Sequence, residues 1–141
     1  MESWRAVWRR GIVPLVCLEQ LKALYVALRD DSKKLIQGAT TTPPPLMAVA
    51  DWPVEASDAM TYLYWQGFPE VTVGEAEEAF ARWCFEIDEA LGEPAACRWF
   101  LNWWDESPRP VVRRELLAEV EKAMELKKGG RGSYESQRRV D

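Results

Sequence analysis

The sequence predicts an all-α fold, a compact single-domain array of about five main helices with one long Thr/Pro-rich loop. Apolar residues recur every three or four positions along most of the chain, the spacing that lines one face of a helix. Capping residues, glycines and prolines separate these stretches, and no segment shows the sustained alternation that predicts a strand. A chain of 141 residues can bury a core of its own, so one domain is expected.

Two helices and a single turn are expected in the first third of the chain. Residues 2–10 predict a short helix that Gly11 ends. Residues 14–28 predict a longer helix, because leucines recur there at helical spacing. Ser32 is expected to cap one further turn, which Gly38 closes.

The long loop is expected over residues 39–49. Three threonines and then three prolines occupy positions 40–45, and consecutive prolines favour polyproline II over helix or central strand. The next helix is predicted over residues 51–66, with Pro53 in its first turn. The loop therefore connects two helical halves of the domain.

Three helices are expected in the remainder of the chain. Thr72 and Glu75 form the pattern of a capping box, and an amphipathic helix is predicted over residues 73–91. An aromatic helix follows over 93–106, and the last helix is predicted from Ser107 to a stop at Gly129. The aromatic helix is apolar on most sides, so we expect it to be central in the core.

The charge of the chain is unevenly distributed. Residues 129–141 show no apolar period and are predicted to form a disordered basic tail, which leaves residues 1–128 as the helical domain. The net charge of −5 divides into +2 on residues 1–10, +3 on 127–141 and −10 on 11–126. An acidic body repels a phosphate backbone, which argues against nucleic acid as the partner.

Composition excludes several kinds of site. The chain has no histidine, which rules out His-containing catalytic triads and mixed Cys/His zinc sites. Its cysteines are widely spaced among apolar neighbours, which indicates buried free thiols in a reducing, cytoplasmic compartment. They are Cys17, Cys84 and Cys97. No targeting segment or membrane-spanning run is predicted, and neither a cofactor nor a metal site is expected.

A polar stripe crosses the aromatic helix. Arg98, Asn102 and Asp105 are spaced by four and three residues, which places them on one helical face. The favoured interpretation is an internal network that ties the helix to the long loop or to a backbone end. The alternatives are a ligand pocket, with Arg98 as the anion-binding group and Trp99 or Trp103 as a flat wall, and plain exposure.

The eight tryptophans suggest a binding surface for another protein, because tryptophan and arginine dominate binding hot spots. The candidate partner surface is Trp4, Trp8, Pro43, Pro44, Pro45 and Trp52. The Thr/Pro loop is favoured as an intramolecular clasp, with a partner-binding ridge as the alternative. The predicted function is a non-enzymatic cytoplasmic adaptor, regulator or complex subunit. The alternative is a small-molecule-binding or enzymatic domain with its pocket at the polar stripe.

Acidic residues on the helix over 73–91 suggest a third possibility. They are Glu75, Glu77, Glu78, Glu86, Asp88 and Glu89. Such a face is similar to the magnesium sites of all-α nucleotide pyrophosphohydrolases, which use paired glutamates on two antiparallel helices. Here the acids lie on one helix with Arg82 among them and no second motif, so a solvated face is favoured.

Several segments resemble those of uncharacterised small bacterial proteins. The segments are Gln37–Thr40, Pro43–Pro45, Asp51–Glu55 and Gly92–Trp103. The resemblance implies a bacterial origin and a single domain without a motif of known chemistry. It implies no activity, ligand or catalytic residue.

Overall fold

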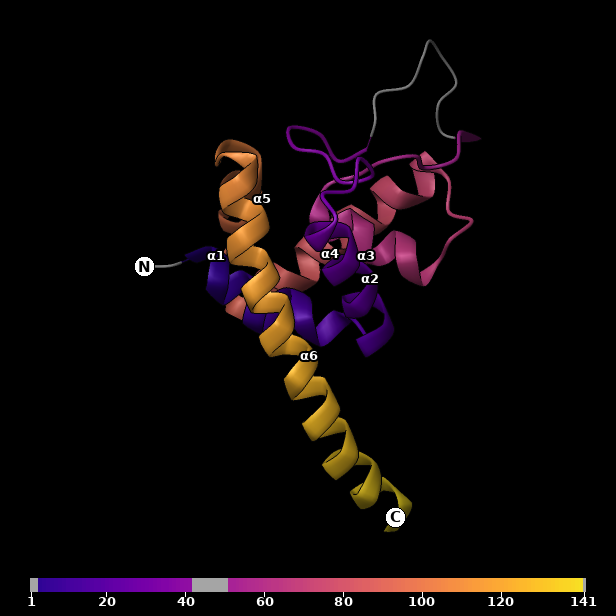
Figure 1. Ribbon diagram of the computed structural model, residues 1–141, viewed down its shortest axis with the longest axis vertical. Helices are drawn as coiled ribbons and strands as arrows, with labels where there is room; N and C mark the ends of the chain where they lie inside the picture. Colours follow the sequence, from indigo (N-terminus) through magenta and orange to yellow (C-terminus); the bar gives the residue numbers. More distant parts are fainter. Residues whose placement is uncertain (1–2, 42–50, 141) are drawn as a thin grey trace.

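The computed structural model describes residues 3–41 and 51–140, with side chains for 4–41 and 51–129. In these ranges the chain forms six α-helices, two shorter helical segments and only isolated β-bridges. The elements are α1 (Ser3–Ala6), the π-helical η1 (Val7–Ile12), the 3-10 turn η2 (Val13–Leu15), α2 (Leu18–Arg29), α3 (Ala59–Gly67), α4 (Val73–Leu91), α5 (Cys97–Glu106) and α6 (Arg109–Val140). The all-α prediction is confirmed, and Figure 1 shows the helices gathered into one body from which α6 projects.

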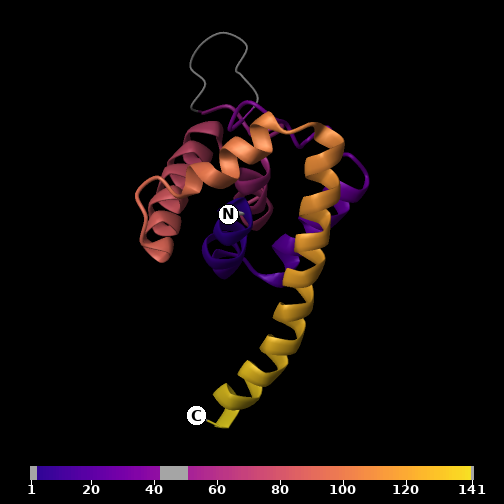
Figure 2. The same cartoon turned by 90° about the vertical axis from the view of Figure 1, so that its left-hand side faces the viewer.

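The N-terminal segment, which comprises α1, η1 and η2, occupies the centre of the fold. The aromatic helix α5 does not. Figure 2 shows the N-terminal segment between α4 and α5 on one side and α6 on the other. Val7, Trp8 and Ile12 are at most 1% exposed. The expectation that Gly11 ends the first helix is wrong, because helical backbone continues through it to Leu15.

Gly11 is required by packing and does not act as a helix stop. It is buried where the N-terminal segment crosses α4, and a Cβ added there would lie 2.8 Å from Cγ2 of Ile87. Ile87 is itself fully buried and cannot easily move away. Only a residue without a side chain allows the two helices to approach this closely.

Replacing Gly11 by alanine is therefore expected to lower the free energy of unfolding by about 1–3 kcal/mol through overpacking. The matched control is Gly129→Ala, because no atom lies within 4 Å of a Cβ at that position of α6. The control is expected to be neutral or stabilising by up to about 1 kcal/mol, the usual gain for alanine over glycine in a helix. Urea denaturation measures both, and a Gly11→Ala variant as stable as the parent would contradict the close approach.

The structure corrects the start of α2. The helix was expected from residue 14, but Pro14 lies in the 3-10 turn η2 and the α-helix begins at Leu18. The backbone N–H of Cys17 donates to the side-chain Oε1 of Gln20 at 2.7 Å, which caps the first turn. Proline fits the first turn of either helix type, so the sequence alone does not separate the two.

The start of α3 also differs from the prediction. The helix was expected from residue 51 but begins at Ala59, where the Asp58 carboxylate accepts a 2.7 Å hydrogen bond from the backbone N–H of Thr61. The residues before Asp58 instead pair with the segment that follows α2. The backbone N–H of Ser57 donates to the carbonyl of Lys34 at 2.8 Å. These tertiary hydrogen bonds keep the residues before Asp58 out of the helix, and the Asp58 side chain caps its first turn.

The C-terminal helices agree more closely with the sequence. The capping box of Thr72 and Glu75 is confirmed, as are the bounds of α4, which ends at Gly92 with φ of 68°. Helix α6 continues past Gly129 to Val140, where the sequence predicted a stop. The disordered tail over 129–141 and the domain limit at 128 stay predictions.

The first turns of α6 hold the end of α2. Arg113 donates to the carbonyls of Leu28 and Arg29, at 2.9 and 3.1 Å, and these carbonyls belong to the last turn of α2. Arg109 pairs with Asp31 at 2.7 Å. Cations are favourable at the C-terminus of a helix. Arg109 and Arg113 therefore have a structural role in joining α2 to α6.

Candidate functional site

Helix α5 has one buried face and one exposed face. Phe100 and Trp104 are each 1% exposed, whereas Arg98, Asn102 and Asp105 all lie at the surface. The polar stripe is therefore not enclosed in the core, and exposure is one of the alternatives that the sequence left open. Phe100 and Trp103 contact the ring of Trp4, whereas Trp99 lies at the surface with the polar residues.

Asp105 belongs to a network with the segment that precedes the Thr/Pro loop. Its carboxylate accepts a 2.8 Å hydrogen bond from the backbone N–H of Gly38. The indole N–H of Trp104 donates to the carbonyl of Ile36 at 2.8 Å, and the side chain of Gln37 donates to the carbonyl of Trp104 at 2.6 Å. The C-terminal half of α5 is thereby tied to residues 36–38, as the favoured interpretation of Asp105 required.

The remaining residues of the predicted pocket have different surroundings. Trp103 is half-buried and stacks on Trp4 with ring centroids 3.7 Å apart. Trp99 is 37% exposed. Arg98 and Asn102 are exposed on the same helix, away from the clefts described below. A binding role for this stripe stays a prediction.

The predicted partner surface is divided by the structure. Trp4 and Trp8 are 7% and 1% exposed, so their expected exposure is wrong and both belong to the core. Pro43, Pro44 and Pro45 lie outside the described residues. Trp52 is 44% exposed and is the one predicted partner residue that the described part of the chain places at the surface.

An exposed aromatic groove lies at the turn between α3 and α4. It has a volume of about 560 Å³. Its lining residues, which define the aromatic groove, are Tyr64, Gly67, Phe68, Pro69, Glu70, Val71, Glu75, Glu78 and Arg82. Phe68 is 56% exposed, although water disfavours such a large apolar side chain at the surface.

The turn fixes Phe68 in this exposed position. Its backbone N–H donates to the carbonyl of Tyr64 at 3.0 Å, and its own carbonyl accepts from the N–H of Val71 at 3.0 Å. The Tyr64 and Phe68 rings lie 4.7 Å apart, and the edge of Tyr64 meets Trp83 at 5.8 Å. Phe68 is therefore held against a supported aromatic floor.

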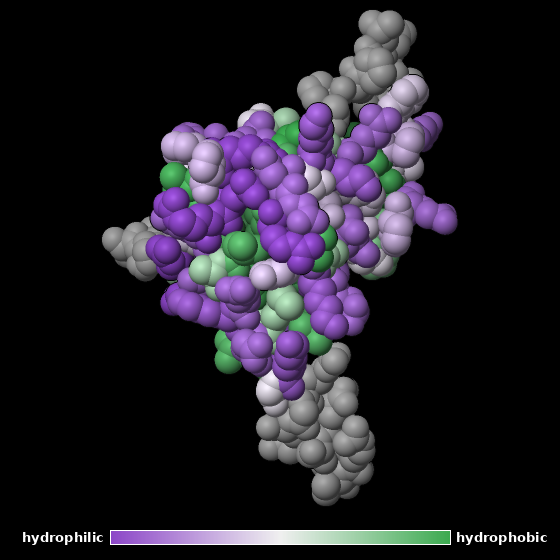
Figure 3. Space-filling view, in the orientation of Figure 1, coloured by the Kyte–Doolittle hydropathy of each residue, from purple (hydrophilic) through white to green (hydrophobic). Residues whose placement is uncertain are grey.

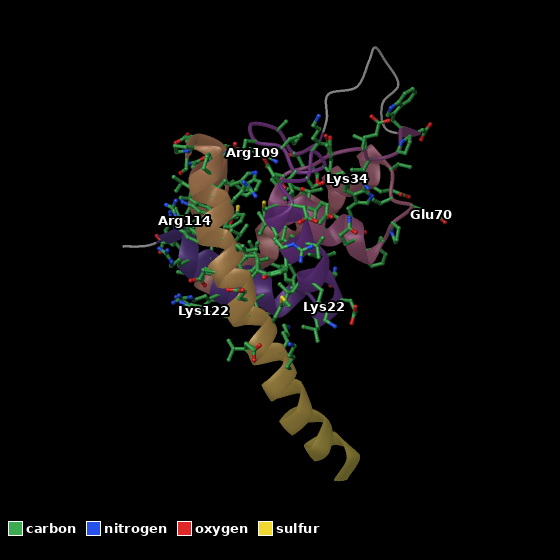
Figure 4. The ribbon with its side chains drawn as sticks, viewed as in Figure 1. Lys22, Lys34, Glu70, Arg109, Arg114 and Lys122 are labelled. Carbon is green, nitrogen blue, oxygen red and sulfur yellow. The ribbon has the colours of Figure 1, made fainter. Side chains whose placement is uncertain are left out.

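The rim of the groove is acidic. Glu70, Glu75 and Glu78 are exposed, and Arg82 is the one cation among the lining residues. One oxygen of Glu75 accepts from the backbone N–H of Thr72, which leaves its charge at the start of α4. Figure 4 shows Glu70 at the outer edge of the turn. The lining residues thus carry a net charge of about −2 in an already acidic body.

Trp52 lies next to the same turn. Its carbonyl accepts a 2.8 Å hydrogen bond from the backbone N–H of Val73, and Pro53 forms an isolated bridge with Thr72. Two exposed aromatic residues, Trp52 and Phe68, therefore flank the start of α4. The sequence singled out Trp52 but missed Phe68, although a phenylalanine between glycine and proline is a signal of an aromatic turn.

The cysteines differ in exposure, against the expectation that all three are buried. Cys17 is exposed, Cys84 is half-buried and Cys97 is buried. A hydrogen bond with Cys97 and burial raise the pKa of the Cys84 thiol, which opposes formation of a nucleophilic thiolate there. Among the described residues, no three Cys, Asp or Glu side chains converge as metal binding would require.

Comparisons with known proteins give no match. No protein-family model, curated protein or solved structure was found similar to this chain. The resemblance to small bacterial proteins therefore stays untested. Within the described residues, none of the helices is both long and apolar enough to cross a membrane.

Proposed function

We propose that this protein is a non-enzymatic interaction module that binds a partner protein in the aromatic groove. The partner supplies a short segment in which arginine or lysine alternates with apolar side chains. The observation that supports the proposal is Phe68, an exposed ring held by its turn on an aromatic floor. The proposal includes a cytoplasmic location, for which the three free thiols are the support.

The chemistry of the groove favours a basic partner. An apolar side chain of the partner removes Phe68 and Tyr64 from water, and a guanidinium can lie over either ring. The carboxylates of Glu70 and Glu78 attract the same cations and determine the orientation of the segment. The acidic body raises the rate of encounter with any basic chain, an effect that salt weakens.

The test uses a nine-residue peptide of alternating arginine and leucine, with a glutamate–leucine peptide as the probe control. Isothermal titration at low salt is expected to show binding of the basic peptide alone. Phe68→Ala is expected to weaken that binding about tenfold or more, because it removes the apolar anchor of the groove. Glu78→Lys is expected to weaken it and to reduce its salt dependence.

Matched control variants lie on α4 outside the groove. Phe85 is 66% exposed and Glu86 is exposed, and neither lines the groove. Phe85→Ala and Glu86→Lys are expected to change the affinity by less than about twofold if the contact is local to the groove. Equal losses in Phe68→Ala and Phe85→Ala, or equal binding of the acidic peptide, would contradict the proposal.

A further inference from the structure

A second cleft lies between the N-terminal segment and α6. Its volume is about 420 Å³. The lining residues, which define the cationic cleft, are Trp8, Arg9, Val13, Glu119, Lys122, Ala123 and Leu126. Leu126 is 71% exposed, and Figure 3 shows apolar surface among hydrophilic side chains along this part of the molecule. The cleft is separate from the aromatic groove, with which it shares no residue.

Trp8, which lines this cleft, carries an unpaired hydrogen-bond donor. Its side chain is 1% exposed, and its indole N–H has no acceptor among the described residues. The indole N–H of Trp104, by contrast, donates to the carbonyl of Ile36. Buried donors are nearly always paired, so an unpaired one on a residue that lines a cleft is a candidate partner for an acceptor bound there.

The cleft also carries surplus positive charge. Arg9 donates to both oxygens of the buried Glu119 carboxylate, at 2.9 and 2.7 Å. Arg5 and Lys122 lie 3.4 and 3.8 Å from the same carboxylate. The hydrogen bond from Arg9 holds the pKa of Glu119 below its usual range, so the carboxylate stays ionised. Among the lining residues, Arg9 and Lys122 against Glu119 leave a surplus of one positive charge. Arg5, outside the lining, pairs with the same carboxylate.

We propose that the cationic cleft binds a small apolar carboxylate, of the class that includes medium-chain fatty acids and aryl carboxylates. The apolar body of the ligand lies against Val13, Ala123 and Leu126. Its carboxylate lies near Lys122 and accepts a hydrogen bond from the unpaired indole N–H of Trp8. The volume is within the range of small-ligand sites, and a single carboxylate offsets the surplus charge of the lining residues. This site does not depend on the function proposed for the aromatic groove.

The test follows the indole N–H of Trp8 by ¹H–¹⁵N NMR during titration with octanoate. The signal is assigned by its loss in Trp8→Phe, which keeps an aromatic ring. Octanoate is expected to move it downfield and to saturate the shift, because a charged acceptor strengthens the hydrogen bond. Octan-1-ol and octylamine have the same chain without the carboxylate and are expected to leave the signal in place.

Two lysine variants distinguish binding of octanoate in the cationic cleft from its attraction to any exposed lysine. Lys122→Gln is expected to weaken octanoate binding about fivefold or more, whereas Lys22→Gln changes it by less than about twofold. Both lysines are exposed, and Figure 4 shows Lys22 on the other side of α6 from Lys122. Phe68→Ala is also expected to leave octanoate binding unchanged, which distinguishes this site from the aromatic groove.

Three results would overturn the proposal. The first is a Trp8 signal that does not move with octanoate, and the second is an equal shift with octan-1-ol. The third is equal loss of binding in Lys122→Gln and Lys22→Gln. Lys122→Gln gives a result even if Trp8→Phe fails to fold, because Lys122 is 67% exposed and contributes little to the core.

Discussion

Replacing Trp104 by alanine is expected to lower the free energy of unfolding by about 3–5 kcal/mol, the range for removal of a large buried aromatic side chain. Trp104 is 1% exposed and is among the largest fully buried side chains of the described core. Its indole N–H also donates to the carbonyl of the half-buried Ile36, so the substitution leaves a cavity and removes that hydrogen bond. Urea denaturation followed by far-ultraviolet circular dichroism measures the loss.

The same chemical change at Trp8 provides the matched control. Trp104→Phe removes an N–H that has an acceptor, whereas Trp8→Phe removes one that has none. Both changes remove about the same volume, so Trp104→Phe is expected to cost about 1–3 kcal/mol more than Trp8→Phe. Equal losses would show that the hydrogen bond to Ile36 contributes nothing to stability.

Replacing Asp58 by asparagine is expected to alter how stability depends on pH. Asp58 is 4% exposed, and burial raises its pKa from 3.8 to about 7 in the folded protein. The folded state then binds more protons than the unfolded state between pH 4 and 7, so this group makes stability fall as pH rises through that window. Asparagine carries no charge and can still accept the cap hydrogen bond from Thr61.

The measurement compares the free energy of unfolding of parent and variant at pH 4.5 and pH 8. The advantage of Asp58→Asn is expected to grow with pH, by as much as about 4 kcal/mol for a pKa shift of about three units. Both measurements lie above the pH at which Glu119 titrates. The pKa of Glu119 is lowered, so the stability that its ionised form contributes is lost only in more acid solution. A difference that is constant with pH would show that Asp58 titrates normally.

The sequence predicted elements whose ends depend on neighbouring residues. The capping box of Thr72 and Glu75 forms within one turn, and Gly92 ends the same helix by adopting a left-handed backbone. Both signals act locally, so the bounds of α4 follow from the sequence alone. The same reasoning predicted an all-α chain correctly, because helical periodicity is a local property.

Elements that depend on distant contacts were not predictable in this way. Gly11 resembles a helix stop in sequence, but its role is to leave space for the side chain of Ile87 on α4. The helix predicted from residue 51 begins instead at Ala59, where Asp58 is the cap and Ser57 is bonded to Lys34. Local rules identify the candidates, and tertiary packing decides between them.

The candidate site shows the same division. Trp4 and Trp8 have the residue type of binding hot spots, but the type does not say whether a ring faces the core or a partner. Phe68 lies in a short turn whose hydrogen bonds hold it outward, and the sequence shows only its flanking Gly67 and Pro69. The acidic residues of α4 are exposed as expected except Asp88, which is half-buried and accepts hydrogen bonds from the backbone N–H groups of Ala95 and Cys97. The position of Glu75 and Glu78 beside Phe68 required the fold.

The most direct test of the central claim is to map where the arginine–leucine peptide binds. A ¹H–¹⁵N NMR titration is expected to move the backbone signals of residues 67, 68, 70 and 71 and of Glu75 and Glu78, which line the aromatic groove. Signals of Arg98 and Asn102 on α5 are expected to stay in place. Shifts confined to α5, or no saturable shift at residues 67, 68, 70 and 71, would contradict the assignment of the groove as the partner site.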